Sequence, residues 1–187
     1  MFKFRIAVGS AVVLALSIGC VLAADKLTSG PQVGQSVPGP FHPLNINGAK
    51  AGEKNCLYCQ NGTNPVAMIF AREVSEPLTT LIKKIDACTE ANKDAKMGSF
   101  VVFLSDSEDL QSKLKEVVDK ESLKNIILSI DNPAGPKGYK VSKEADVTVV
   151  LYTNHTVKAN FAYGKGELKD KDIETVVASV PKILTTE

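Results

Sequence analysis

Residues 147–163 read VTVVLYTNHTVKANFAY, and this stretch decides the fold. Val147–Tyr152 and Val157–Tyr163 are dense in β-branched and aromatic residues, which favours two β-strands. Only a short polar connection, centred on Asn154 and His155, separates them. A connection of this length and kind predicts a tight β-hairpin.

Upstream of the hairpin, strand-like and helix-like segments alternate. The three earlier strands are almost wholly apolar, as strands covered on both faces are, and we expect them at Val66–Phe70, Phe100–Leu104 and Ile126–Ile130. Three segments have helical periodicity. Their apolar faces are Leu78, Leu81, Ile82, Ile85 and Cys88, then Leu110, Leu114, Val117 and Val118, and last Ile173, Val176, Val177 and Val180. Ser75 is the predicted N-cap of the first helix. The order predicts an α/β sandwich with a central mixed sheet flanked by helices.

The first 24 residues have the pattern of a secretory signal peptide. Lys3 and Arg5 precede an apolar run from Ile6 to Leu22, and the small pair Ala23–Ala24 follows it. A retained membrane anchor is an alternative, because the run is close to the length that crosses a bilayer. Lipidation at Cys20 is a weaker alternative, because Ser17 stands where a lipobox has Leu. We therefore expect an exported protein, periplasmic or extracellular, with no membrane span after processing.

The charge of the mature chain argues against two classes of partner. Removing the two leader cations from 22 basic residues leaves 20 basic against 21 acidic residues, a net charge of −1. A near-neutral chain has no electrostatic case for binding nucleic acid or an anionic membrane surface. The roughly 160 residues that remain are enough for one domain with its own core.

Several phrases, in their order along the chain, resemble the redoxin or thiol-specific-antioxidant (AhpC/TSA-like) branch of the thioredoxin superfamily. They are Gly34–Pro38, Val66–Ala71, Ser129–Pro133 and the final hairpin, followed by Gly166–Leu168 before the closing helix. The resemblance covers about Val33 to Leu184 and implies a thioredoxin-like three-layer sandwich. It divides the chain into a signal peptide at 1–24, an extended lead-in at 25–45 and a redoxin-type domain at 46–187.

The active-site loop implied by this resemblance is degenerate. In the family, the nucleophilic cysteine follows the first core strand and begins the next helix, where the helix N-terminus stabilises a thiolate. Here that loop, Arg72–Pro77, contains no cysteine, and Glu73 and Glu76 would repel a thiolate. Val147 also stands where the family has a cis-proline. Peroxide reduction or dithiol exchange at the usual position is therefore not expected.

The mature chain keeps Cys56, Cys59 and Cys88. Cys56 and Cys59 form a CxxC motif, but it precedes the first core strand. The resembling topology therefore places it at the opposite end of the sheet from the usual site. The first long helix runs back toward that end, so all three sulfurs are candidates to be neighbours. Cys88 also lies on the apolar stripe of its helix, where a buried free cysteine is common.

Three interpretations of the CxxC remain open. A structural disulfide suits an oxidising compartment, but so short a loop contributes only about 2 kcal/mol, whereas a link to Cys88 would contribute about 3.7. A relocated redox dithiol is equally favoured, with Lys50 and Lys54 nearby supporting a thiolate. A metal site ranks well behind, because zinc normally has four ligands and neither histidine is close in sequence. We expect no cofactor and no metal.

Two functions from different classes follow. The leading hypothesis is thiol–disulfide exchange with protein thiols or disulfides, carried by Cys56 and Cys59 with Cys88 as a possible third thiol. The alternative is a non-catalytic binding module with a structural disulfide, which holds an unidentified protein partner around Arg72, Glu73 and Tyr139. His42 and His155 are expected at the surface, and the sequence leaves open whether the protein is an enzyme.

Overall fold

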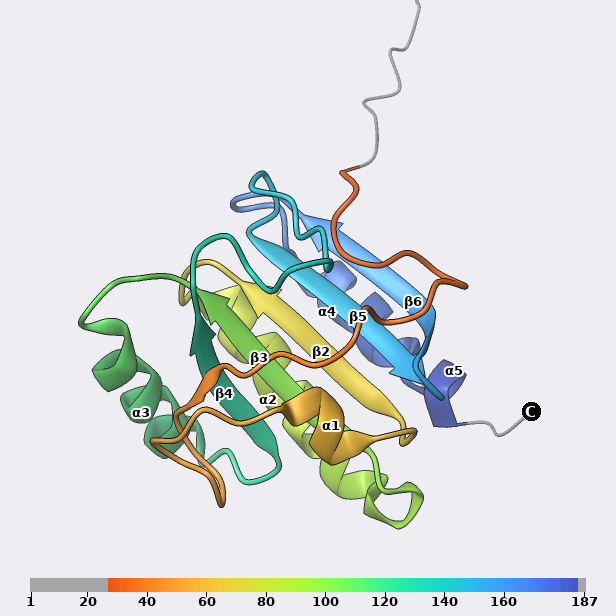
Figure 1. Cartoon of the computed structure of the whole chain (residues 1–187), viewed down its shortest axis with the longest axis horizontal. Helices are drawn as coiled ribbons and strands as arrows, with labels where there is room; N and C mark the ends of the chain where they lie inside the picture. The colour runs from red at the N-terminus through yellow and green to blue at the C-terminus, as the bar shows by residue number, and fades with distance from the viewer. Residues whose placement is uncertain (1–26, 185–187) are drawn as a thin grey trace, which may run out of the picture.

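A mixed β-sheet with helices on its faces forms the centre of the protein (Figure 1). The computed structural model describes residues 27–184, so the predicted signal peptide at 1–24 lies outside the described residues. In chain order the elements are β1 (Leu44–Asn45), α1 (Leu57–Asn61), β2 (Val66–Ala71), α2 (Glu76–Ala91), a 3₁₀ turn (Lys93–Ala95), β3 (Gly98–Leu104), α3 (Leu110–Glu121), β4 (Ile126–Asp131), β5 (Val147–Thr153), β6 (Thr156–Tyr163), α4 (Asp170–Ala178) and α5 (Pro181–Leu184).

The six strands of this sheet lie in the order β1-β4-β3-β2-β5-β6. β2, β3 and β4 are parallel, while β5 is antiparallel to β2, β6 to β5, and β1 to β4. The mixed sheet and the final hairpin are as predicted. Asn154 and His155 are its two-residue turn, and both have positive φ, 49° and 59°. A turn of this kind matches the right-handed twist of the two strands that it joins.

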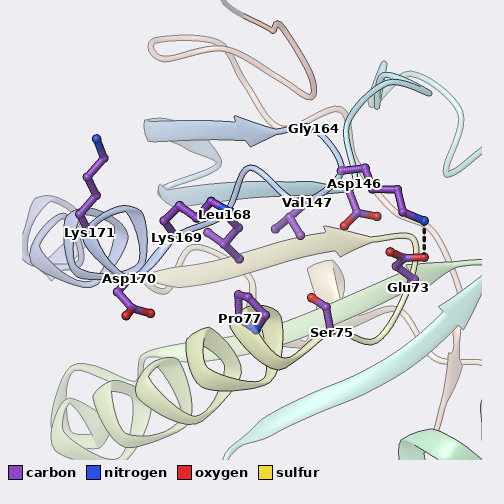
Figure 2. A pocket seen from close by; sticks show the side chains of 12 residues that line it. Glu73, Ser75, Pro77, Asp146, Val147, Gly164, Leu168, Lys169, Asp170 and Lys171 are labelled. Carbon is purple, nitrogen blue, oxygen red and sulfur yellow. Dashed lines mark hydrogen bonds and ion pairs between the residues drawn. The ribbon is translucent and has the colours of Figure 1, made fainter.

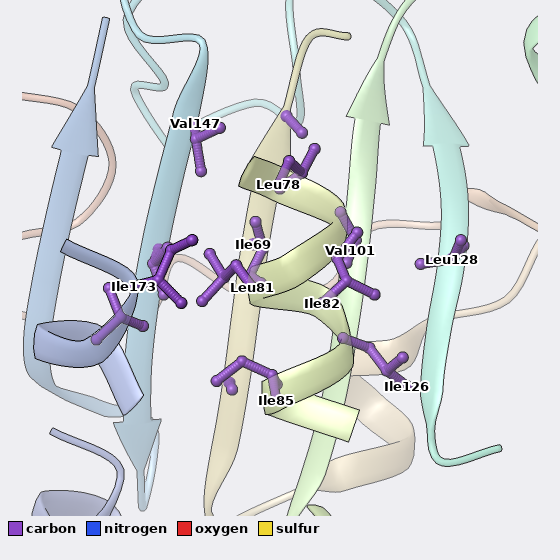
Figure 3. Packing of buried hydrophobic residues seen from close by; sticks show 14 of the residues in the cluster. Ile69, Leu78, Leu81, Ile82, Ile85, Val101, Ile126, Leu128, Val147 and Ile173 are labelled. Carbon is purple, nitrogen blue, oxygen red and sulfur yellow. The ribbon is translucent and has the colours of Figure 1, made fainter. Parts of the chain in front are cut away.

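Two apolar layers cover the sheet, one on each face. Along β2 the side chains alternate between them: Ala67 and Ile69 face the layer beneath α2, and Met68 and Phe70 face the other layer. Figure 3 shows the first layer, where Leu78, Leu81, Ile82 and Ile85 of α2 pack against the sheet. The prediction that the first three long strands are covered on both faces is confirmed for β2 and β3, which are almost wholly buried, and only in part for β4, where Ile127 and Ile130 are half-buried.

The start of α2 follows the predicted capping pattern. Ser75 has extended backbone, and its Oγ accepts a hydrogen bond from the Leu78 amide at 3.4 Å. Pro77 lies in the first turn, where its missing N–H leaves no helical hydrogen bond unmade. α2 is thus fixed at the carboxyl end of β2 and runs back toward the opposite end of the sheet (Figure 1).

Residues 27–45 pack onto the face of the sheet opposite α2. Val37 and Phe41 are buried in the second apolar layer, together with Tyr139. Backbone hydrogen bonds join Gly34 and Gln35 to Val157 at 2.9 and 3.0 Å. The segment ends in β1, the edge strand beside β4. The predicted lead-in therefore supplies part of the core and one strand of the sheet.

Candidate functional site

The CxxC motif forms a disulfide at the start of α1. Cys56 is the N-cap residue of this short helix, and Cys59 lies in its first turn. Their sulfur atoms are bonded, and their Cα atoms are 5.2 Å apart. The backbone N–H of Cys59 also donates a hydrogen bond to the Sγ of Cys56 at 3.1 Å. The two cysteines are therefore held together both by the covalent bond and by the local turn.

The two cysteines differ in exposure. Cys56 is buried, with 7% of its surface accessible, whereas Cys59 is exposed. Both border an open hollow of about 510 Å³, whose other lining residues are Ala49, Lys50, Asn55 and Gln60. The Asn55 Nδ2 donates to the Gln60 Oε1 at 3.0 Å, so these two side chains form part of one ordered rim. A thiol on another molecule can therefore approach the disulfide from the side of Cys59.

The chain before α1 is held by the edge of the sheet. Asn45 N–H donates to the Glu53 carbonyl at 3.0 Å, and Asn55 N–H donates to the Pro43 carbonyl at 3.1 Å. These bonds pair the residues just before Cys56 with β1 and its preceding residue. The position of the first sulfur is therefore set by the sheet and not by a free loop.

Helix α1 is also anchored by contacts of its own. Leu57 is 2% exposed and, with Tyr58, packs in the second apolar layer. The Tyr58 ring lies 4.9 Å from the His155 ring, centroid to centroid, which joins α1 to the β5–β6 turn. The Asn61 Nδ2 donates to the Leu57 carbonyl at 2.8 Å. None of these contacts involves a sulfur atom.

Asn61 fits only because residue 98 is glycine. A Cβ built on Gly98 would lie 1.8 Å from the Asn61 Oδ1, which is far closer than two atoms can approach. Gly98 is the first residue of β3, so this contact seats α1 directly on the sheet. Helix α1, its contact with Gly98 and the Tyr58–His155 pair were not predicted from the sequence. The one available signal was Gly62, which follows the helix with φ of 53° and marks its end.

The disulfide lies at the end of the sheet predicted for it. Helix α1 comes before Val66, the first residue of β2, and Val66 pairs with Tyr152 near the β5–β6 turn. Val147 pairs instead with Ala71, the last residue of β2. β2 has six residues, so about 20 Å of strand separates its two ends. The CxxC and the degenerate loop at Val74 therefore lie at opposite ends.

Cys88 does not join the other two cysteines, and the expectation that all three sulfurs are neighbours is wrong. Cys88 is free and packs against the apolar layer beneath α2, whereas α1 packs on the opposite layer. The sheet therefore lies between them. Burial raises the pKa of the Cys88 thiol above its usual value, with only partial opposition from the Lys84 ammonium. This environment disfavours a reactive thiolate.

At the opposite end, a cavity of about 550 Å³ occupies the region beside the degenerate loop (Figure 2). Ser75, Pro77, Val147 and Leu168 line it, and no described cysteine does. The Glu73 carboxylate at its rim forms an ion pair with Lys165 at 3.0 Å. The pKa of Asp146, on the same rim, is raised first by burial and then by the negative charge of Glu73.

Two residues of the predicted partner-binding face make hydrogen bonds that stabilise the fold. The Arg72 guanidinium donates hydrogen bonds to the carbonyls of Pro133, Ser142 and Ala145 at 3.0 to 3.1 Å. These bonds hold the loop between β4 and β5 in place. Tyr139 is 1% exposed, and its hydroxyl donates to the Gly39 carbonyl at 2.5 Å. Burial raises the pKa of this phenol far above its usual value. The placement of Tyr139 on a binding surface was therefore wrong, whereas Arg72 is half-exposed and borders an open hollow with Glu73 and Val74.

The two histidines differ in exposure. His42 is exposed as expected, but His155 is half-buried against Tyr58, and its Nδ1 has no hydrogen-bond partner among the described residues. Within residues 27–184, no three potential metal-ligating side chains cluster. In the same range no helix combines the length and the apolar character needed to traverse a bilayer.

Comparison with known proteins identifies the fold. No protein-family model and no curated protein matches the sequence. Solved structures do match: a putative thiol:disulfide interchange protein DsbE from Chlorobium tepidum, at 15% identity and a TM-score of 0.60, covers 86% of this chain and 100% of its own. The chain has a thioredoxin-like fold.

Two further structures agree with this thioredoxin-like fold. A putative protein disulfide isomerase from Bacteroides thetaiotaomicron has a TM-score of 0.63 at 12% identity, over 84% of this chain and 94% of its own. Peroxidoxin BcpB from Mycobacterium tuberculosis has a TM-score of 0.58 at 13% identity, over 82% of this chain and 98% of its own. At these identities the likeness establishes the three-layer architecture, and the chemistry has to be argued from the site.

Proposed function

We propose that this protein exchanges disulfides with protein thiols outside the cytoplasm, and that the Cys56–Cys59 pair carries the reaction. The observation that supports the proposal most directly is a formed CxxC disulfide whose second cysteine is exposed beside an open hollow. Thiol–disulfide exchange requires that an incoming thiolate reach a disulfide sulfur. This arrangement meets that requirement on a thioredoxin-like fold.

The length of the disulfide loop favours exchange over a purely structural role. A bond between cysteines three residues apart restricts the unfolded chain little and contributes about 2 kcal/mol. A link to Cys88 would contribute about 3.7 kcal/mol, yet Cys88 is free. Helix α1 already has anchors in Leu57, Tyr58 and Asn61. The disulfide therefore adds little to the stability of the fold, and its exposed cysteine is accessible to an incoming thiol.

Export is the second part of the proposal. The leader at 1–24 has the signal-peptide pattern, and disulfides persist in the periplasm and outside the cell. Secreted protein whose first residue is Asp25 would support this part, and retention of Met1 would contradict it.

A binding module remains the second candidate, and the cavity beside Val147 is the observation that favours it. In that case the ligand would lie at the end of the sheet away from the disulfide, among Glu73, Asp146 and Lys165. The disulfide would then be inert, which separates the two candidates experimentally.

The test is the reduction potential of the Cys56–Cys59 pair together with turnover of scrambled-disulfide ribonuclease. We expect turnover by the wild type, none by a Cys56→Ser/Cys59→Ser double variant, and an unchanged rate for Cys88→Ser as the matched control, because Cys88 lies across the sheet. A potential below about −300 mV with no wild-type turnover would instead identify a structural disulfide.

A further inference from the structure

The Cys56–Cys59 disulfide is asymmetric in its access to solvent. Cys56, at the start of α1, is 7% exposed and follows a segment paired with β1. Cys59 is exposed on the first turn of the helix. An incoming thiolate must approach a disulfide sulfur from the side away from its partner. Cys59 is thus the more exposed residue of the pair, although both cysteines border the hollow, and attack at its sulfur is favoured.

The hydrogen bond to Cys56 also favours attack at Cys59. The Cys59 N–H donates to the Cys56 Sγ at 3.1 Å, so a donor is already in place at that sulfur. An N–H aimed at a sulfur stabilises negative charge on it. Exchange is faster when the departing sulfur is the better-stabilised thiolate. Access favours attack at Cys59, and the hydrogen bond favours departure of Cys56.

We propose that Cys59 forms the mixed disulfide with the partner and that Cys56 is the resolving cysteine. This inference rests on the proposed exchange function and assigns a direction to it. Cys56, the cysteine at the start of the helix, is the buried one. The assignment therefore follows from exposure and from the hydrogen bond at Cys56, and not from the position of a cysteine at the start of a helix.

The exchange transfers two electrons and two protons between the partner and the Cys56–Cys59 pair. A partner thiolate attacks the Cys59 Sγ, a bond forms between the two, and the Cys56–Cys59 bond breaks with its electron pair on Cys56. A second partner thiolate then attacks the partner sulfur of the mixed disulfide, and Cys59 leaves as a thiolate. The partner dithiol loses two electrons and two protons, and Cys56 and Cys59 gain them as two thiols. In the reverse direction Cys59 attacks a partner disulfide, and Cys56 resolves the mixed disulfide.

The surroundings of Cys59 fit a polar polypeptide segment as the partner. The hollow beside it is bordered by Lys50, Asn55 and Gln60, which offer hydrogen bonds to a peptide backbone. Lys50 is paired with Glu53 at 3.2 Å, so the rim carries no strong net charge. We infer that partner selection depends on access to Cys59 more than on charge.

Two single-thiol variants test the assignment. In the full chain with Cys20→Ser and Cys88→Ser, Cys56→Ser retains only Cys59, and Cys59→Ser retains only Cys56. Each is mixed with excess oxidised glutathione, and the mixed disulfide is followed by intact mass. We expect the Cys56→Ser variant to react at least about tenfold faster under native conditions, and the two rates to converge in urea, where neither thiol is buried.

A second measurement uses the wild-type disulfide and needs no variant. Limiting reduced glutathione is added to the oxidised protein, the reaction is quenched with acid, and peptide mapping locates the glutathione. We expect it on Cys59. Glutathione on Cys56, or faster reaction of the variant that retains Cys56, would overturn the assignment and leave the exchange function intact. Absence of any native exchange, in variants and wild type alike, would overturn both proposals.

Discussion

Reduction of the Cys56–Cys59 disulfide should weaken the fold only slightly. The bond closes a ring of four residues, and the chain-entropy relation assigns about 2 kcal/mol to a ring of that size. The other anchors of α1 survive reduction, because the Leu57 burial, the Tyr58–His155 contact and the Asn61 hydrogen bond involve no sulfur. The reduced protein is therefore expected to remain folded.

The same free energy also predicts how the fold affects the redox chemistry. If the disulfide stabilises the folded state by about 2 kcal/mol, then folding stabilises the disulfide by the same amount. For a two-electron couple this is about 40 mV. The folded pair should therefore be about 40 mV more reducing than the same pair in the chain unfolded by urea. A difference this small leaves the bond open to exchange.

Urea unfolding of the oxidised and the reduced protein measures this free energy. The Cys56→Ser/Cys59→Ser double variant should match the reduced wild type, and Cys88→Ser should match the oxidised wild type, since Cys88 forms no bond. A loss of more than about 4 kcal/mol on reduction, or loss of cooperative unfolding, would refute the reasoning and identify a structural disulfide.

Two other predictions concern the elements that hold each end of the sheet. Gly98→Ala should cost about 1–3 kcal/mol in urea unfolding, because its Cβ overlaps Asn61. Adding Asn61→Ala should remove most of that extra cost, and simple additivity of the two changes would contradict the contact. Asp146→Asn tests the pKa shift: because burial and then Glu73 raise the pKa of Asp146, the folded chain holds this proton more tightly than the unfolded chain. Its contribution favours folding at low pH and is lost as pH rises through the raised pKa, so the variant should gain stability relative to the wild type as pH rises above the ordinary Asp pKa of about 3.9. A difference that does not change with pH would contradict the shift.

Local sequence pattern was enough for most of the scaffold. The five long strands and three long helices follow from runs of β-branched residues and from helical periodicity, because each such element is long enough to repeat its pattern. The β5–β6 turn follows from Asn154, whose residue type tolerates positive φ. β1 and α1 were missed, since two and five residues are too few to show any period.

The candidate site was predictable in part. The residue order alone places a CxxC before the first core strand, and hence at the end of the sheet away from Val147. Sequence spacing says nothing about which face of the sheet a helix covers. The proximity of Cys88 was therefore predicted wrongly, because α1 and the last turns of α2 lie at the same end but pack on opposite layers.

The sequence by itself determined the order of strands and helices, the absence of a cysteine from Arg72–Pro77 and the presence of the CxxC. The cysteine positions are read directly from the residue order. The strands and helices depend on the propensities of neighbouring residues, which act over a few positions. Only the tertiary structure decided that Cys56 is buried and Cys59 exposed, that Cys88 is free, and that Arg72 and Tyr139 make hydrogen bonds that stabilise the fold. The physical reason is that burial and long-range hydrogen bonds depend on residues far apart in the chain, which meet only when both faces of the sheet are covered.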